Sequence, residues 1–358
     1  MTGRRPPLRP GLESIAAYQA PQVEAPVRLN TNECPYPLPE AFARDLADAV
    51  GRIGFNRYPD RDAMALRKGL AELTGHPAEG VWAANGSNEV IQHLCLAYGG
   101  PGRRALVFEP TYALHTLIPR MVGMEVAAER LGEGFELDPT AAAAAGERHG
   151  ASVVFVCSPN NPTGNAQPLA AVESLCAATD GLVIVDEAYI EFGGETALPL
   201  LDRNPNLAVV RTFSKAFSLA AARVGYCLAA PELVAELLRV RLPYHLSALT
   251  QAAGEVALRH LGEARALLDD IRGQRDRIAE ALSAVPAVET FPTDANFVLF
   301  RTELDAARLW QALLDRGVLV RDVSGAPGLG GCLRVSAGTP EETGTFLDAL
   351  PTAMEAAS

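Results

Sequence analysis

Lysine is almost absent from this chain, although positive charge is not. Of the 31 basic residues, 29 are arginine, and only Lys68 and Lys215 are lysine. A retained lysine can do what a guanidinium cannot, because it can lose its proton near neutral pH and attack a carbonyl as a free amine. Lys68 stands beside Arg67 on a predicted helix, and we expect it to be solvated. Lys215 follows the apolar run 207–210, and we take it as the candidate nucleophile. The alternative is that this lysine is retained by chance and has no catalytic role.

Other missing features narrow the class of protein further. No stretch of 18 uninterrupted apolar residues occurs, so we expect no membrane-spanning helix. No apolar segment follows the charged residues near the N-terminus, so we expect no secretory signal. The net charge is −12 and no basic block offsets it, which argues against binding of nucleic acid. No G-x-G-x-x-G string follows a first strand, which argues against a dinucleotide-binding oxidoreductase.

The cysteines form no recognisable metal or disulfide pattern. The chain contains no C-x-x-C string and no Cys/His cluster, so we expect no metal site. Several of the cysteines lie inside apolar runs, which favours buried free thiols in a reducing cytoplasm. The six residues are Cys34, Cys95, Cys157, Cys176, Cys227 and Cys332.

Short apolar runs, separated by segments with helical periodicity, indicate the fold class. The runs are apolar at every position, which is typical of strands whose two faces are both covered. Strands alternating with helices predict an α/β fold with a mainly parallel sheet. The runs span residues 105–108, 153–156, 182–185, 207–210 and 225–228.

After about residue 245 the pattern changes to that of a smaller α+β unit. We predict a long helix over 251–284, a strand over 296–300 and a helix over 306–314. Two strands near 318–320 and 332–335 and a last helix from Pro340 complete this unit. The predicted organisation is an N-terminal arm (1–45) packing with the small domain, a large domain (46–245) and a small C-terminal domain (246–358).

Polar residues directly follow the buried runs, and one crevice at the carboxyl ends of parallel strands would collect them. Asn161, Asp186 and Lys215 each stand at or just beyond the end of a predicted strand, with Arg223 eight residues after Lys215. A buried carboxylate needs a cation, and the protonated ring nitrogen of pyridoxal phosphate is one. Taken singly, Asp186 could instead be a helix cap, Arg223 a surface charge, and the segment around Asn161 a turn.

The order of these motifs resembles that of the fold-type I pyridoxal-phosphate aminotransferases. The similarity spans nearly the whole chain and implies a large α/β/α domain with a mainly parallel sheet and a smaller α+β domain. The matching strings lie at residues 29–33, 57–60, 85–89, 110–112, 158–164, 185–189, 212–217, 243–247, 295–297 and 334–339.

That resemblance implies roles for individual residues at the ring of pyridoxal phosphate. Lys215 would form a Schiff base with the aldehyde, and Asp186 would keep the ring nitrogen protonated. Asn161 and Tyr189 would hydrogen-bond the ring oxygen, and Tyr112 would stack on the ring.

Further implied contacts concern the phosphate and the substrate. Tyr58 would reach the phosphate from the other subunit of a homodimer, Arg334 would bind the substrate anion with Arg321 nearby, and Tyr18 would touch the substrate. The remaining phosphate-side residues are Gly86, Ser87, Asn88, Ser214 and Arg223; Gly86 to Asn88 precede a predicted helix, whose N-terminus favours anions.

Within this family the strings are similar to those of the branch that acts on histidinol phosphate. The implied reaction exchanges L-histidinol phosphate and 2-oxoglutarate for imidazole acetol phosphate and glutamate, by a ping-pong mechanism in histidine biosynthesis. Two departures bear on specificity: Cys34 replaces a usual asparagine, and Ala221-Ala222 replaces a common Gly-Leu pair. The open alternatives are an aromatic or broad-specificity aminotransferase and a lyase resembling threonine-phosphate decarboxylase. A regulator fused to a DNA-binding module is disfavoured, because the strand pattern begins within the first hundred residues.

Overall fold

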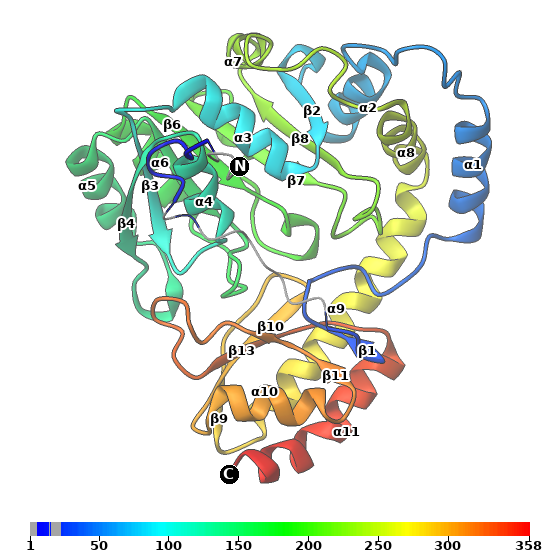
Figure 1. The fold of residues 1–358 in the computed structure, drawn as a ribbon, viewed down its shortest axis with the longest axis vertical. Coiled ribbons are helices and arrows are strands. Elements are labelled where there is room, and N and C mark those ends of the chain that lie inside the picture. Colours follow the sequence, from blue (N-terminus) through cyan, green and yellow to red (C-terminus); the bar gives the residue numbers. More distant parts are fainter. Residues whose placement is uncertain (1–5, 14, 16–22) are drawn as a thin grey trace, which may run out of the picture.

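A computed structural model describes residues 6–13, 15 and 23–358. Its main feature is a seven-stranded sheet, shown in the upper half of Figure 1. Four neighbouring pairs are parallel, whereas β8 runs antiparallel to both of its neighbours. The strands, in spatial order, are β2 (Val81–Asn85), β8 (Val224–Ala229), β7 (Leu207–Thr212), β6 (Leu182–Asp186), β5 (Val153–Cys157), β3 (Arg104–Glu109) and β4 (Glu125–Arg130).

Helices cover both faces of this sheet, which gives the three layers predicted for the fold. Alternate residues of one strand enter opposite cores: Val183 and Val185 of β6 pack in one cluster, and Leu182 and Ile184 in the other. The first cluster includes residues of α2 (Met64–Thr74), α5 (Pro139–His149), α6 (Leu169–Ala178) and α8 (Ala248–Arg259). The second includes residues of α3 (Ser87–Tyr98), α4 (Leu114–Met121) and α7 (Pro231–Leu237). Helix α1 (Glu40–Gly51) buries Phe42 in the first cluster.

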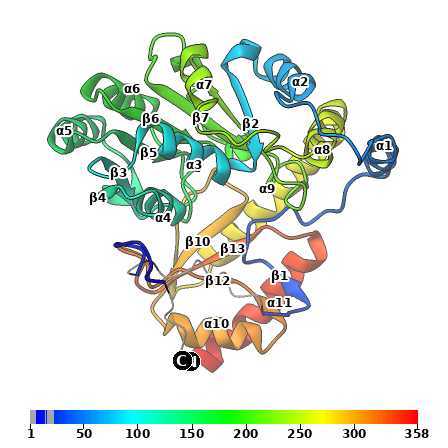
Figure 2. The ribbon, with the colours of Figure 1, turned by 45° about the horizontal axis from the view of Figure 1, so that its top comes forward.

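A smaller antiparallel sheet lies below the large one in Figures 1 and 2. Its strands, in spatial order, are β12 (Arg321–Asp322), β13 (Cys332–Ser336), β10 (Phe297–Thr302) and β9 (Val288–Thr290). A shared apolar core joins this sheet to α9 (Leu261–Ser283), α10 (Ala306–Leu314) and α11 (Pro340–Ala357). Beside it, β1 (Val27–Arg28) pairs in parallel with β11 (Val318–Leu319). The domain boundaries at residues 45 and 245 stay a prediction.

Local sequence explains where two helices of this smaller part begin. The Thr339 side chain accepts from the backbone N–H of Glu342, and the Glu342 side chain accepts from the backbone N–H of Thr339, forming a capping box. Pro340 fills the first helical position, where no N–H is needed. Asp305 caps α10 by accepting from the N–H of Arg308.

The structure differs from the sequence prediction at the long helix over 251–284. The chain forms two helices, and His260 separates α8 from α9 with φ −111° and ψ 28°. Both imidazole nitrogens of His260 contact carboxylates: Nε2 lies 3.0 Å from Asp45, and Nδ1 lies 3.0 Å from Glu263. The prediction was wrong because apolar residues continue on both sides of the break, whereas the contact of His260 with Asp45 comes from tertiary structure. Among the described residues, no helix is long and apolar enough to cross a membrane.

Candidate active site

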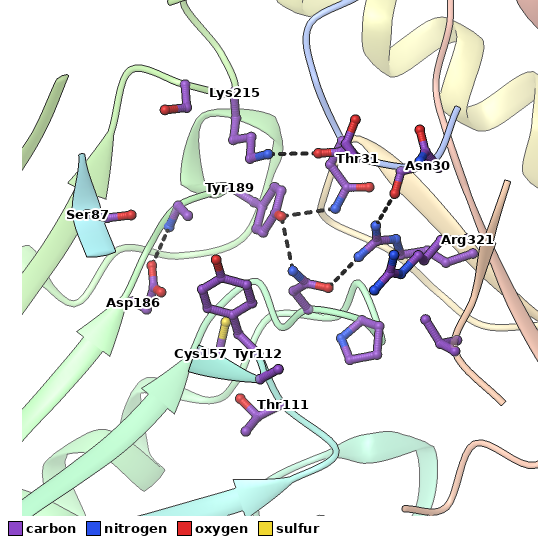
Figure 3. A pocket seen from close by; sticks show the side chains of 18 of the residues that line it. Asn30, Thr31, Ser87, Thr111, Tyr112, Cys157, Asp186, Tyr189, Lys215 and Arg321 are labelled. Atoms are coloured by element: carbon purple, nitrogen blue, oxygen red, sulfur yellow. Dashed lines mark hydrogen bonds between the residues drawn. The ribbon is translucent and has the colours of Figure 1, made fainter. Parts of the chain in front are cut away.

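A cavity of about 450 Å³ opens between the carboxyl ends of the large sheet and the edge of the small sheet. Figure 3 shows side chains from both parts of the chain pointing into it. Eleven predicted site residues line the cavity: Ser87, Asn88, Tyr112, Asn161, Asp186, Tyr189, Ser214, Lys215, Arg223, Arg321 and Arg334. The structure therefore brings together the side chains that follow β5, β6 and β7.

Lys215 lies just after β7 and extends into the cavity. Its Nζ donates to the backbone oxygen of Thr31 at 2.9 Å and lies 6.0 Å from the centre of the Tyr189 ring. Burial, followed by the positive charge of Arg334, lowers the pKa of Lys215 to about 8. The amine is therefore partly unprotonated near neutral pH, which a nucleophile requires.

Asp186 ends β6 and is 2% exposed. Its Oδ2 contacts Nε2 of His115 at 3.0 Å, and its Oδ1 accepts from the N–H of Ala188 at 3.1 Å. His115 is fully buried, stacks on Phe155 and lies edge-on to Tyr112. These contacts fix the carboxylate in the floor of the cavity, where it can stabilise a cationic ring nitrogen.

The Tyr189 hydroxyl lies at the centre of a hydrogen-bond network in Figure 3. It accepts from Nδ2 of Asn32 at 2.9 Å and from Nδ2 of Asn161 at 3.2 Å. Burial raises the pKa of Tyr189 to about 12, so the phenol keeps its proton at neutral pH. A protonated hydroxyl can donate to an anionic oxygen of a bound ring.

The end of the cavity at the N-terminus of α3 has the features of a phosphate cradle. Ser87 is the first residue of α3, and helix N-termini favour anions. Arg223 donates from Nη1 to Oγ of Ser214 at 3.3 Å. A Cβ on Gly86 would lie 2.5 Å from Nη2 of Arg223, and one on Gly225 would lie 2.2 Å from the backbone nitrogen of Ser87. Gly225 therefore lets the start of α3 lie directly against β8, and Gly86, with a φ of 85°, leaves room for the Arg223 guanidinium beside the helix N-terminus.

Two arginines from the small sheet form another wall. Arg321 on β12 and Arg334 on β13 are directly opposite in the strand register. Arg334 donates to the Asn30 backbone oxygen at 2.7 Å and to Oδ1 of Asn161 at 2.6 Å. Neighbouring guanidinium groups repel each other, so an anion between them would be stabilised by both.

Two predicted site residues do not line the cavity, and the position of a third is not described. Tyr58 does not line the cavity; its side chain is 80% exposed and stacks on Tyr244 with ring centres 4.4 Å apart. Gly86 does not line the cavity itself, but its lack of a side chain leaves room for Arg223, which does. Tyr18 lies outside the described residues.

Sequence reasoning missed two residues that organise this site. His115 was not singled out, although it lies only three residues after Tyr112, in the first turn of α4. Asn32 belongs to a matching string but was given no role. Its positive φ of 54° and its bond to Tyr189 depend on packing that no local pattern reveals.

The residues present fit pyridoxal phosphate. Lys215 supplies an amine with a lowered pKa, Asp186 a buried carboxylate for the ring nitrogen, and Tyr189 a donor for the ring oxygen. The cradle at Gly86, with Arg223 and the N-terminus of α3, suits the phosphate.

Comparisons with known proteins agree with this chemistry. Residues 24–350 match the family described as aminotransferase class I and II. A histidinol-phosphate aminotransferase of Frankia casuarinae is 49% identical, over 96% of this chain and 89% of the relative. Another, from Thermobifida fusca, is 49% identical over 97% and 95% of the two chains. The crystal structure of histidinol-phosphate aminotransferase from Sinorhizobium meliloti in complex with pyridoxal-5'-phosphate is similar to this chain, with a TM-score of 0.88 over 98% of each chain. Because the two sequences are only 23% identical, this similarity establishes the fold and nothing further.

Proposed function

The chain belongs to the class I and II aminotransferase family, and we propose that it interconverts L-histidinol phosphate and 2-oxoglutarate with imidazole acetol phosphate and glutamate, in histidine biosynthesis. The observation that carries the substrate assignment is the cross-strand pair Arg321 and Arg334 in the cavity that holds Lys215. Histidinol phosphate has a phosphate-bearing arm where glutamate has its α-carboxylate. A guanidinium fork can bind either anion, so one wall serves both substrates.

The cofactor of this reaction is pyridoxal phosphate, which supplies an aldehyde for amine exchange and a ring that withdraws electrons from the substrate carbon. Asp186 stabilises the positive charge on the ring nitrogen, and Tyr189 and Asn161 bind the ring oxygen. Ser87, Asn88, Ser214 and Arg223 bind the phosphate. Tyr112 covers the ring.

Lys215 has two tasks in this proposal. Its amine would hold the cofactor through the aldehyde, and when free it would accept a proton from the substrate carbon at Nζ. A pKa near 8 suits an amine that must accept and release protons near neutral pH. The two substrates occupy the same site in turn, which predicts ping-pong kinetics.

We further propose that the protein is a homodimer in which Tyr58 reaches the phosphate region of the partner's site. Tyr58 is 80% exposed and does not line its own cavity. Large apolar side chains are also exposed at Phe55, Leu242 and Leu249. Burial of these side chains against a second subunit would remove apolar surface from water. A cytoplasmic location is proposed as well, and it is supported by six cysteines that are all free thiols.

A half-reaction screen tests the substrate. Purified protein carrying the cofactor is mixed separately with histidinol phosphate, histidine, phenylalanine and threonine phosphate, and the loss of cofactor absorbance is followed. We expect histidinol phosphate to react fastest. Rapid reaction with phenylalanine alone would identify an aromatic aminotransferase, and release of carbon dioxide from threonine phosphate would identify a lyase.

A further inference from the structure

Asn32 is a buried residue whose hydrogen bonds connect the small sheet with the large one. It is 1% exposed and has a φ of 54°, in the left-handed region that residues other than glycine rarely adopt and that asparagine tolerates better than most. Its backbone oxygen accepts from Nδ2 of Asn296 at 3.2 Å, which ties it to the small sheet. Its side chain reaches Tyr189 beyond the end of β6 in the large sheet.

The hydrogen bonds between Asn32 and Ser336 start from a backbone N–H, which can only donate. The backbone N–H of Asn32 donates to Oγ of Ser336 at 3.0 Å. The Ser336 hydroxyl then directs its own proton to Oδ1 of Asn32 at 2.9 Å. With Oδ1 engaged in this way, the Nδ2 group of Asn32 faces the Tyr189 hydroxyl as a donor.

The same reasoning fixes the amide of Asn161. A guanidinium can only donate, so the 2.6 Å contact from Nη1 of Arg334 identifies the acceptor on Asn161 as Oδ1. Its Nδ2 group therefore also faces Tyr189. Two N–H donors thus occupy both acceptor positions of one hydroxyl, and the proton of Tyr189 is directed to another acceptor.

We propose that Asn32 is a positioning residue that makes Tyr189 a hydrogen-bond donor to the cofactor ring oxygen. In this way Asn32 sets the pH at which the linkage between Lys215 and the cofactor is half-protonated. This inference rests on the proposed function. In the unprotonated form of the linkage, the positive charge beside the anionic ring oxygen is absent. A hydrogen-bond donor at that oxygen therefore stabilises the unprotonated form more than the protonated form. Loss of that donor moves the midpoint to higher pH.

Absorbance of the protein carrying pyridoxal phosphate, followed as a function of pH, tests the inference. Asn32→Asp keeps the side-chain shape but replaces the amide donor with an acceptor, which draws the Tyr189 proton away from the ring oxygen. We expect the midpoint to rise by about one pH unit, because a hydrogen bond to a charged group is comparable in size to one pKa unit.

A Tyr189→Phe background separates the lost donor from the added negative charge. There, Asn32→Asp should move the midpoint by less than half as much, since no hydroxyl proton can be redirected. Equal shifts in both backgrounds, or no shift in either, would overturn the inference.

If Asn32→Asp does not fold, Ser336→Ala provides the test, because it removes the donor that holds Oδ1 and keeps Asn32. A smaller upward shift supports the inference, and an unchanged midpoint overturns it. A wild-type protein that shows no cofactor absorbance after incubation with pyridoxal phosphate would instead contradict the proposed function.

Discussion

At the scale of single residues, the chemistry depends on an amine that is unprotonated at moderate pH. Burial lowers the pKa of Lys215 to about 8, so the neutral amine is lost as the pH falls below that value. We therefore predict that the rate of reaction between the cofactor-free protein and pyridoxal phosphate rises with pH, with a midpoint near 8. Stopped-flow absorbance measures this rate. Lys68→Arg, at an exposed position, serves as the control and should leave the profile unchanged. A midpoint near the ordinary lysine value would contradict the burial argument.

Arg334 tests the anion wall at the same scale. Its guanidinium donates to Asn30 and Asn161 and faces the cavity. Lysine keeps the charge but loses the planar fork, so we expect Arg334→Lys to lower kcat/KM for both the amino donor and the oxo acid by roughly 30- to 100-fold, which corresponds to about 2–3 kcal/mol. Arg321→Lys on the neighbouring strand should also lower kcat/KM, but by less, because Arg321 is half-buried whereas Arg334 is buried. Unchanged specificity constants in Arg334→Lys would refute the assignment.

At the scale of elements, His260 holds the junction of α8 and α9 against α1. Hydrogen bonds to Asp45 and Glu263 raise the pKa of His260. A raised folded-state pKa contributes stability that is fully present below the unfolded value, about 6.5, and is lost as the pH rises through the folded value. We therefore predict that His260→Ala lowers Tm more at pH 5.5 than at pH 8.5. Thermal unfolding of both proteins at the two pH values measures this. An equal loss of Tm would show that only the packing of His260 on Phe42 matters.

Element by element, the sequence predicts the central strands better than their neighbours. The runs at β5, β6 and β7 are apolar at nearly every position because both faces are buried, so they are visible without structure. The direction of β8 was not predictable from its composition. The 11 residues between β7 and β8 are too few for the helical crossover that parallel strands need, and the strand therefore returns antiparallel.

The residues of the candidate site were likewise predictable only in part. Asn161, Asp186 and Lys215 were predictable as neighbours because parallel strands end at one edge of a sheet. His115 and Asn32 acquire their places through contacts with residues 71 and 157 positions away. Such contacts have no local period or spacing, so only the folded structure reveals them.

At the scale of the whole molecule, the proposed dimer assigns Tyr58 to the partner's site. Mixing Lys215→Ala protein with Tyr58→Phe protein tests this by subunit exchange. Each mixed dimer would contain one site with both native residues, so random exchange of equal amounts restores about one quarter of all sites. Activity measured before and after incubation should therefore rise above the mean of the two separate proteins. Constant activity, with exchange shown by mass-labelled subunits, would place Tyr58 in its own subunit's site or outside both.

The near absence of lysine permits a direct test of the central claim, which is that the Lys215 amine joins the cofactor. Protein carrying pyridoxal phosphate is reduced with borohydride, digested and analysed by mass spectrometry. The account predicts the cofactor mass on the peptide containing Lys215, with none on the peptide containing Lys68 and none after Lys215→Arg. A reduced cofactor on Lys68, or full labelling of the Lys215→Arg protein, would contradict it.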